Sequence, residues 1–130
     1  MKAVYPIVIS KCDSDYVVYI PDFDINTEGK DVADAIAMAR DAIGITGCYL
    51  EDEEKQLPAP SALEKVARTK NDDIITLVDI DFAEYRRKND QRTVRKNLTL
   101  PSWLNVEAEK QGINFSKVLQ EALLDRLQQR

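Results

Sequence analysis

Short apolar runs separated by turn-forming residues occupy the first third of the chain. Residues 3–10 and 16–20 are rich in β-branched and aromatic side chains, which favours β-strands, and residues 26–29 close a short third segment. Pro6 has no N–H group to donate to a strand ladder, so residues 3–10 should form an edge strand or pair at this point only through their other side. The pattern therefore predicts three antiparallel strands in succession.

A helical spacing of apolar residues replaces the strand pattern after residue 30. Asp31 is placed to cap a helix, and Asp34 stands at its third position. We expect this helix to end near residues 44–47. Its apolar stripe has the i, i+4, i+7 and i+11 spacing of one helix face and consists of Val32, Ile36, Ala39 and Ile43.

The middle of the chain predicts a short helix, a strand and a linker. Ser61 and Glu64 have the spacing of a capping box, which indicates a short helix, and residues 74–80 predict a fourth strand. Residues 82–92 are polar and basic without helical periodicity, so we interpret them as a linker. Residues 1–81 should then form an α+β domain of three antiparallel strands, a helix, a short helix and a fourth strand.

The last forty residues carry a second alternating pattern. Leu98 and Leu100 alternate with polar residues, and because side chains alternate across a strand, the leucines should share one face. Pro101 ends this strand. The opposite face would present Arg95, Asn97 and Thr99.

Two short amphipathic helices should follow this strand. The first covers residues 102–111, and Gly112 stands in the position that favours a left-handed residue after a helix. Asn114 is a good N-cap for the second helix, in which apolar residues recur at i, i+3, i+4, i+7 and i+8 from Phe115 onward.

This strand–helix–helix segment, residues 93–130, lacks the means to fold alone. A single strand forms no sheet, and about forty residues bury too little apolar surface without a staple, a metal or a partner. A second copy would complete a two-stranded ribbon, so we expect a homodimer. Assembly of such dimers into a tetramer is an alternative that the sequence leaves open. The expected dimer core is made of Leu98, Leu100, Leu104, Val118, Leu119, Ala122 and Leu123.

The polar face of such a ribbon has the chemistry to read DNA. Two-stranded ribbons enter the major groove, where arginine pairs with guanine, asparagine with adenine, and threonine with either a polar edge or the thymine methyl. We therefore predict base reading by Arg95, Asn97 and Thr99. The first turn of the last helix offers free amides to a phosphate, and the expected contacts there are Asn114, Phe115, Ser116 and Lys117.

Charge is distributed unevenly between the two halves. The net charge is −5, but residues 1–85 hold 8 Lys and Arg against 18 Asp and Glu, whereas residues 86–130 hold 10 against 5. This reversal suggests two domains that face different partners. The first residues contain no apolar segment typical of a signal peptide, and two cysteines without metal-ligand spacing favour a cytoplasmic protein with reduced thiols.

Catalysis is not expected. The chain has no histidine, and no glycine-rich phosphate loop or nucleophile motif occurs, so we predict no enzyme, cofactor or metal. Three aspartate pairs at i, i+2 spacing would share a strand face and leave open a metal-dependent nuclease. We interpret them as turn caps and solvated edges; they are Asp13/Asp15, Asp22/Asp24 and Asp79/Asp81.

Residues 93–128 resemble the ribbon-helix-helix fold of bacterial repressors, on the strand from Arg95 to Pro101, the break at Gly112 and the Asn114-x-Ser116 turn. In that family the outward strand residues read bases and the start of the second helix holds the DNA backbone. Lys96 departs from the pattern because it occupies an inward position that is often apolar.

The front of the chain resembles the HicB antitoxins, on the strand around Pro6, the run from Tyr16 to Asp22, Gly29 and the alanine-rich helix after it. The resemblance implies a partial ribonuclease-H-like domain that neutralises a HicA-type, mRNA-cleaving ribonuclease toxin, in a type II toxin–antitoxin pair that represses its own operon. The family often has a Gly-Cys pair where this chain has Asp24 and Ile25. The residues expected to contact the toxin are Asp22, Phe23, Asp24 and Glu28.

One alternative is a ribbon-helix-helix transcriptional regulator whose front domain senses a ligand or oligomerises. The other is the metal-dependent ribonuclease-H-like nuclease. The acidic front domain favours a basic partner such as an RNA-cutting enzyme, because opposite charges speed and orient association. We therefore expect an antitoxin whose partners are the toxin, operator DNA and a second copy of the chain.

Overall fold

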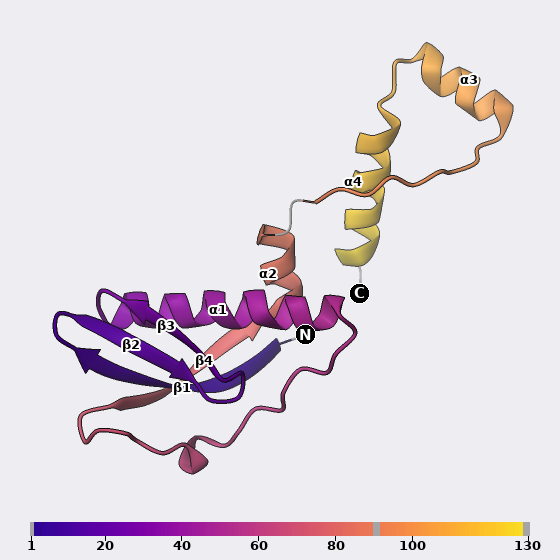
Figure 1. Cartoon of the computed structure of the whole chain (residues 1–130). Helices are drawn as coiled ribbons and strands as arrows, with labels where there is room; N and C mark the ends of the chain where they lie inside the picture. The colour runs from indigo at the N-terminus through magenta and orange to yellow at the C-terminus, as the bar shows by residue number, and fades with distance from the viewer. Residues whose placement is uncertain (1, 90–91, 129–130) are drawn as a thin grey trace. The chain divides into compact units, whose positions relative to one another are not determined.

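A computed structural model describes residues 2–89 and 92–128 of the chain. It divides into two compact units, residues 1–92 and residues 93–130, which we describe separately (Figure 1). The first unit contains all the strands and the two helices α1 and α2. The second contains helices α3 and α4.

The first unit is built on a four-stranded antiparallel sheet in the order β3-β2-β1-β4. Its strands are β1 (Lys2–Cys12), β2 (Asp15–Ile20), β3 (Ile25–Gly29) and β4 (Ile74–Asp81). Helix α1 (Val32–Asp52) lies along one face of this sheet (Figure 1). The four strands expected from the apolar runs are confirmed.

The core fills the space between the sheet and α1. Alternate residues of each strand face the helix, so the apolar stripe of α1 covers them. As predicted, the side chain of Asp31 caps α1, accepting a hydrogen bond of 2.7 Å from the amide of Asp34. The buried core residues are Tyr5, Ile7, Ile9, Val18, Ile20, Ala35, Ala39, Ile43, Val78, Ile80 and Phe82.

Pro6 does not make β1 an edge strand, because β1 lies between β2 and β4. The alternative prediction, that the strand pairs at Pro6 through only one of its two sides, agrees with the register. Pro6 lies opposite Leu77 of β4, whereas the register with β2 begins only at Val8, opposite Tyr19. The missing proline N–H therefore falls where no β2 partner is in register.

Helix α1 does not end at residues 44–47 but continues to Asp52, because its two glycines make room for another helix. That helix is α2 (Phe82–Asn89), so the prediction of a linker without regular structure is wrong for residues 82–89. A β-carbon added to Gly44 would lie 2.5 Å from the Tyr85 ring, and one added to Gly47 would lie 2.2 Å from the Phe82 ring. Close packing thus overrides the tendency of glycine to end a helix.

The predicted short helix is reduced to one 3-10 turn, Leu63–Lys65, and its capping box does not form. Ser61 instead donates from its amide to Asp22 at 2.9 Å, and its hydroxyl binds the same carboxylate. Ser61 thereby joins the α1–β4 connection to the segment between β2 and β3.

The second unit consists of α3 (Ser102–Lys110), α4 (Phe115–Gln128) and an extended segment before them. Residues 93–100 have no regular secondary structure in the single chain. Gly112 has a φ of +67° directly after the end of α3, as its expected role requires. Asn114 caps α4 by accepting a hydrogen bond of 3.1 Å from the amide of Lys117, which confirms the predicted N-cap.

Replacing Gly47 by alanine should lower the free energy of unfolding by about 1–3 kcal/mol, because the added methyl group overpacks the contact with Phe82. Helix propensity alone predicts the opposite sign, a gain of up to about 1 kcal/mol. Urea unfolding of the wild type and the variant decides between the two. Ala37→Gly, at an exposed position of α1, is the control for propensity without packing. Equal or higher stability of Gly47→Ala would contradict the close α1–α2 contact.

Candidate partner-binding surfaces

The face of the sheet that points away from α1 exposes large apolar side chains. Val4, Val17, Tyr19 and Leu77 are between 37% and 47% exposed. Val17, Tyr19 and Leu77 share this face because each is out of phase with the buried residues of its own strand. Val4 belongs to the same face because it is in phase with Pro6, which lies opposite Leu77; Pro6 itself is buried on this face. In Figure 1, α1 lies on the other side of the sheet, and the connection between α1 and β4, with its 3-10 turn, is drawn below the sheet. We call these four residues the open sheet face.

Acidic residues stand beside the open sheet face. Glu28 of β3 lies opposite Val17 in the strand register. Asp24 has a φ of +52° and accepts a hydrogen bond of 2.8 Å from the hydroxyl of Tyr19. This hydrogen bond raises the pKa of Tyr19 above its ordinary value, so the hydroxyl stays protonated. Apolar surface and negative charge are therefore adjacent.

The four residues expected to contact a toxin have different surroundings. Asp24 and Glu28 are exposed, next to the open sheet face. Asp22 is engaged with Ser61, and the ring of Phe23 packs edge-to-face against Tyr5 at a centroid distance of 4.8 Å. Asp22 and Phe23 thus have contacts that hold the unit together.

The apolar run at residues 16–20 is a sequence signal for the open sheet face. Residues 16–20 are apolar or aromatic at every position instead of alternating with polar residues. In an antiparallel sheet with a helix on one side only, such a strand must expose half of these side chains or cover them with a partner.

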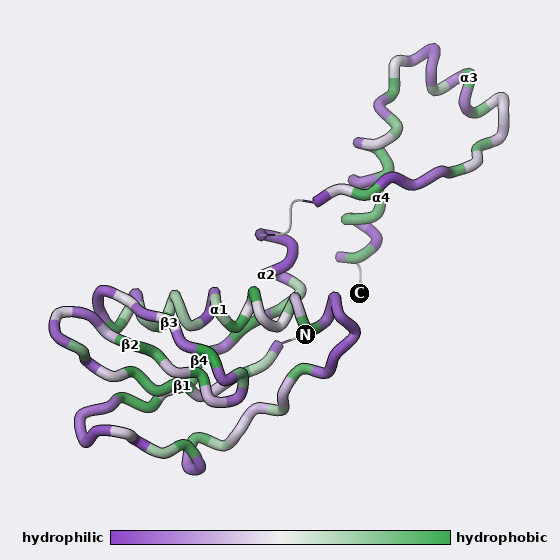
Figure 2. The backbone as a smooth tube through the Cα atoms, viewed as in Figure 1, coloured by the Kyte–Doolittle hydropathy of each residue, from purple (hydrophilic) through white to green (hydrophobic). Residues whose placement is uncertain are grey.

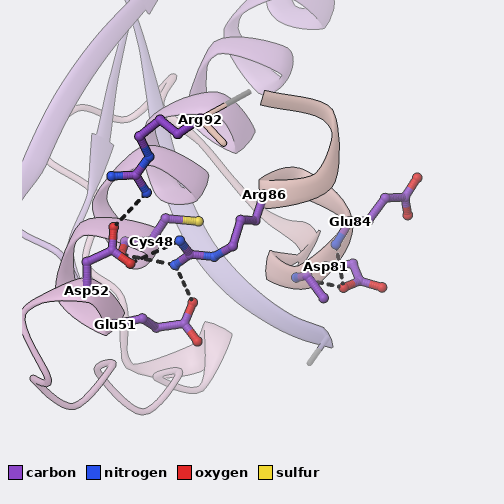
Figure 3. A network of polar contacts seen from close by, with 8 residues as sticks. Cys48, Glu51, Asp52, Asp81, Glu84, Arg86 and Arg92 are labelled. Atoms are coloured by element: carbon purple, nitrogen blue, oxygen red, sulfur yellow. Dashed lines mark hydrogen bonds and ion pairs between the residues drawn. The ribbon is translucent and has the colours of Figure 1, made fainter. Parts of the chain in front are cut away.

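A network of polar contacts fixes α2 to the C-terminal end of α1 (Figure 3). The guanidinium of Arg86 lies 3.0 Å from the carboxylate of Asp52 and 3.6 Å from that of Glu51, and it donates to the carbonyl of Cys48 at 3.3 Å. Arg92 pairs with the other oxygen of Asp52 at 3.6 Å. These contacts add to the glycine-mediated packing of the two helices.

Tyr85 makes a further link between the two helices. Its hydroxyl donates a hydrogen bond of 2.8 Å to Asp41 of α1. Burial, helped by this carboxylate, raises the pKa of Tyr85 to about 12. The phenol is therefore neutral at any physiological pH, and it acts as a structural contact.

The aspartates that would serve a nuclease are used in structural contacts. Asp79 pairs with Arg40 of α1 at 3.0 Å. Asp81 accepts hydrogen bonds from the amides of Ala83 and Glu84 at the start of α2, and these bonds lower its pKa. Among the described residues, no group of three or more possible ligands is arranged to hold a metal ion.

The second unit exposes its apolar side chains to solvent in the single chain. Figure 2 shows hydrophobic positions recurring along the whole of α4. No described residue of residues 93–128 is buried. All seven residues of the predicted dimer core are exposed, and the six large aliphatic ones are between 37% and 63% exposed. These six are Leu98, Leu100, Leu104, Val118, Leu119 and Leu123, and the seventh residue is Ala122.

The predicted DNA-contacting residues are accessible in this unit. Arg95, Asn97 and Thr99 lie on the extended segment and are exposed, as is the first turn of α4 with Ser116 and Lys117. The side chain of Asn114 is occupied in capping the helix. No helix among the described residues is both long and apolar enough to cross a membrane.

Comparison with known proteins assigns the chain to a family. The sequence matches the HicB-like antitoxins of bacterial toxin–antitoxin systems over residues 5–122. This match covers most of both units, so the chain belongs to the HicB-like antitoxin family.

Individual relatives include one phage protein and chains of two toxin–antitoxin complexes. An uncharacterized 14.9 kDa protein from the rep–hol intergenic region of Haemophilus phage HP1 (strain HP1c1) is 32% identical over 106 residues, 78% of this chain and 75% of the relative. A chain of a toxin–antitoxin complex from Streptococcus pneumoniae is 28% identical with a TM-score of 0.62, covering 97% of this chain and 99% of that one. A chain of the HicA3 and HicB3 toxin–antitoxin complex is 27% identical with a TM-score of 0.52, covering 61% and 99%.

Proposed function

We propose that this antitoxin binds and neutralises a HicA-type ribonuclease toxin through its first unit, and represses its own operon through a dimeric ribbon-helix-helix formed by its second unit. In this proposal the protein has no catalytic activity of its own. The observation that carries it is the presence of two uncovered surfaces of different chemistry. One is apolar with acidic neighbours, and the other is apolar with a polar extended segment before it.

The first surface has the chemistry of a site for a basic protein. Residues 1–92 hold 12 Lys and Arg against 19 Asp and Glu, so this unit attracts a cationic partner. An enzyme that binds RNA must itself carry a basic surface, because the RNA backbone is anionic. On the open sheet face, Val17 and Tyr19 would supply the apolar contact, and Asp24 and Glu28 the charged rim.

The second surface has the chemistry of a homodimer. Pairing of two copies of residues 93–100 would satisfy their strand hydrogen bonds and place Leu98 and Leu100 between four helices. The alternation of the strand would then turn Arg95, Asn97 and Thr99 outward, toward the base edges of a major groove.

We expect Val17→Lys to weaken toxin binding at least 10-fold, about 1.4 kcal/mol, because it places a cation against a basic partner. Isothermal titration with a HicA-type ribonuclease toxin measures the affinity, and co-expression with the same toxin measures rescue of growth. The matched control is Ile45→Lys on α1, which changes an exposed apolar residue outside the open sheet face. Equal affinity of Val17→Lys and Ile45→Lys would move the toxin site elsewhere.

We expect the full chain to sediment as a dimer or a larger assembly at micromolar concentration. Leu100→Asn should produce monomers with reduced helix content, because it introduces a polar amide into the shared core. Thr99→Asn, one residue away on the outward face, should leave the assembly unchanged. Wild-type monomers with full helix content in sedimentation and circular dichroism would rule out the dimeric ribbon.

Arg95→Ala should reduce affinity for the operator by about 1–3 kcal/mol and affinity for random DNA much less, because a base contact is lost. Ser116→Ala should weaken both alike, because a phosphate contact has no sequence dependence. Fluorescence anisotropy with a duplex from upstream of the gene and a shuffled duplex of equal length measures both. An equal loss on the two duplexes for Arg95→Ala would make Arg95 a phosphate contact.

A further inference from the structure

The C-terminal end of α2 carries a cluster of cations directly before the second unit. Arg86, Arg87, Lys88 and Arg92 lie within seven positions, and the chain enters the second unit at Thr93. Arg86 is only about one-third exposed and is held by acceptors at the end of α1 (Figure 3). It fixes the helix, and the other three cations remain at the surface.

These three cations are available to an anionic partner. Arg87 is exposed and forms no hydrogen bond or ion pair with any residue that the structure describes. Lys88 pairs with Glu84 at 2.9 Å and Arg92 with Asp52 at 3.6 Å, but both basic side chains are at least 70% exposed. Exposed ion pairs of this kind contribute little to stability, so a phosphate can take the place of the carboxylate.

The second unit has few cations of its own for a DNA-binding element. Residues 93–130 hold 6 Lys and Arg against 4 Asp and Glu. Of the net charge of +5 on residues 86–130, residues 86–92 carry +3 and residues 93–130 carry +2, so more than half of it belongs to the first unit. Affinity for DNA depends mainly on the number of phosphates that a protein neutralises. If Arg95 contacts bases, the second unit has one cation fewer for phosphates, so further phosphate contacts require cations outside this unit.

Chain connectivity keeps the cluster close to the residues expected to read bases. Arg92 and Arg95 are three positions apart, so their α-carbons are at most about 11 Å apart, and Arg87 and Arg95, eight positions apart, are at most about 28 Å apart. One turn of DNA measures about 34–36 Å. The cluster therefore stays within one turn of the bases that Arg95 would contact, whatever the arrangement of the two units.

We propose that Arg87, Lys88 and Arg92 form an auxiliary contact with the phosphate backbone of duplex DNA that flanks the bases read by the second unit. This proposal rests on operator binding by that unit. The contact offsets the repulsion between DNA and the acidic remainder of the first unit. Because Arg86 and the packing of Phe82 and Tyr85 hold α2 in place, Arg87 and Lys88 are presented by an ordered helix, and Arg92 follows it in the chain.

The test is the salt dependence of DNA binding by the full chain. Each phosphate contact contributes about −0.9 to the slope of log K against log salt. The double variant Arg87→Ala/Lys88→Ala should reduce the magnitude of this slope by about 2 per protomer, equally on the upstream duplex and the shuffled duplex. The matched control, Lys30→Ala/Lys65→Ala, removes the same charge from exposed positions far from α2 in the sequence and should change the slope by less than half as much.

The possible outcomes separate this inference from the proposed function. A slope equal to that of the control pair, with preference for the upstream duplex intact, would overturn the contact by α2 and leave operator binding standing. A wild-type protein without preference for the upstream duplex would overturn both. Circular dichroism and urea unfolding should show a folded double variant, because Arg87 has no partner among the described residues and Lys88 only an exposed one.

Discussion

The central constraint on this molecule is that its second unit cannot bury its own apolar surface. Two helices of nine and fourteen residues and one extended segment leave every large aliphatic side chain of that unit at least partly exposed. Apolar surface of this extent is unfavourable in water, and an unpaired extended segment leaves its backbone groups without protein partners. In the proposed dimer one event satisfies both requirements, which makes folding of this unit inseparable from its association.

The first unit differs, because it buries a core on one face of its sheet and leaves apolar side chains exposed on the other face. Its sheet, α1 and α2 share one core, in which Gly44 and Gly47 allow the rings of Tyr85 and Phe82 to approach the helix axis. The other side of the sheet keeps Val17 and Tyr19 at the surface next to carboxylates. Exposed apolar side chains grouped in this way are unfavourable in water, and such a group is typical of a face that another protein covers.

Local sequence rules predicted the elements that depend on local chemistry. The caps at Asp31 and Asn114 and the left-handed Gly112 lie where expected, because each is determined by hydrogen bonds within one turn. The errors arose where distant residues decide. The sequence at Gly44 and Gly47 predicts a helix end, whereas in the fold these glycines accommodate the rings of Phe82 and Tyr85, whose three-residue spacing fits one face of a packed helix.

The same reasoning applies to the candidate sites. Asp22 is exposed in any local interpretation, and only the fold reveals that Ser61, from a distant loop, occupies it. Tyr19 was overlooked because the sequence does not say which face of a strand a helix will cover. The prediction for Arg95, Asn97 and Thr99 needs no such knowledge, since their alternation with Leu98 and Leu100 is a property of the sequence itself.

The position of α2 connects the two proposed activities physically. It is packed on α1 of the first unit, which is proposed to bind the toxin, and in the sequence it precedes the segment that is proposed to read DNA. A proposed dimer holds two such junctions, so two acidic units are tethered beside one DNA site. DNA repels their net negative charge, and a bound basic toxin would neutralise part of that charge. Toxin binding and DNA binding are then electrostatically coupled through the first unit, and linkage requires that each ligand alter the affinity of the other by the same factor.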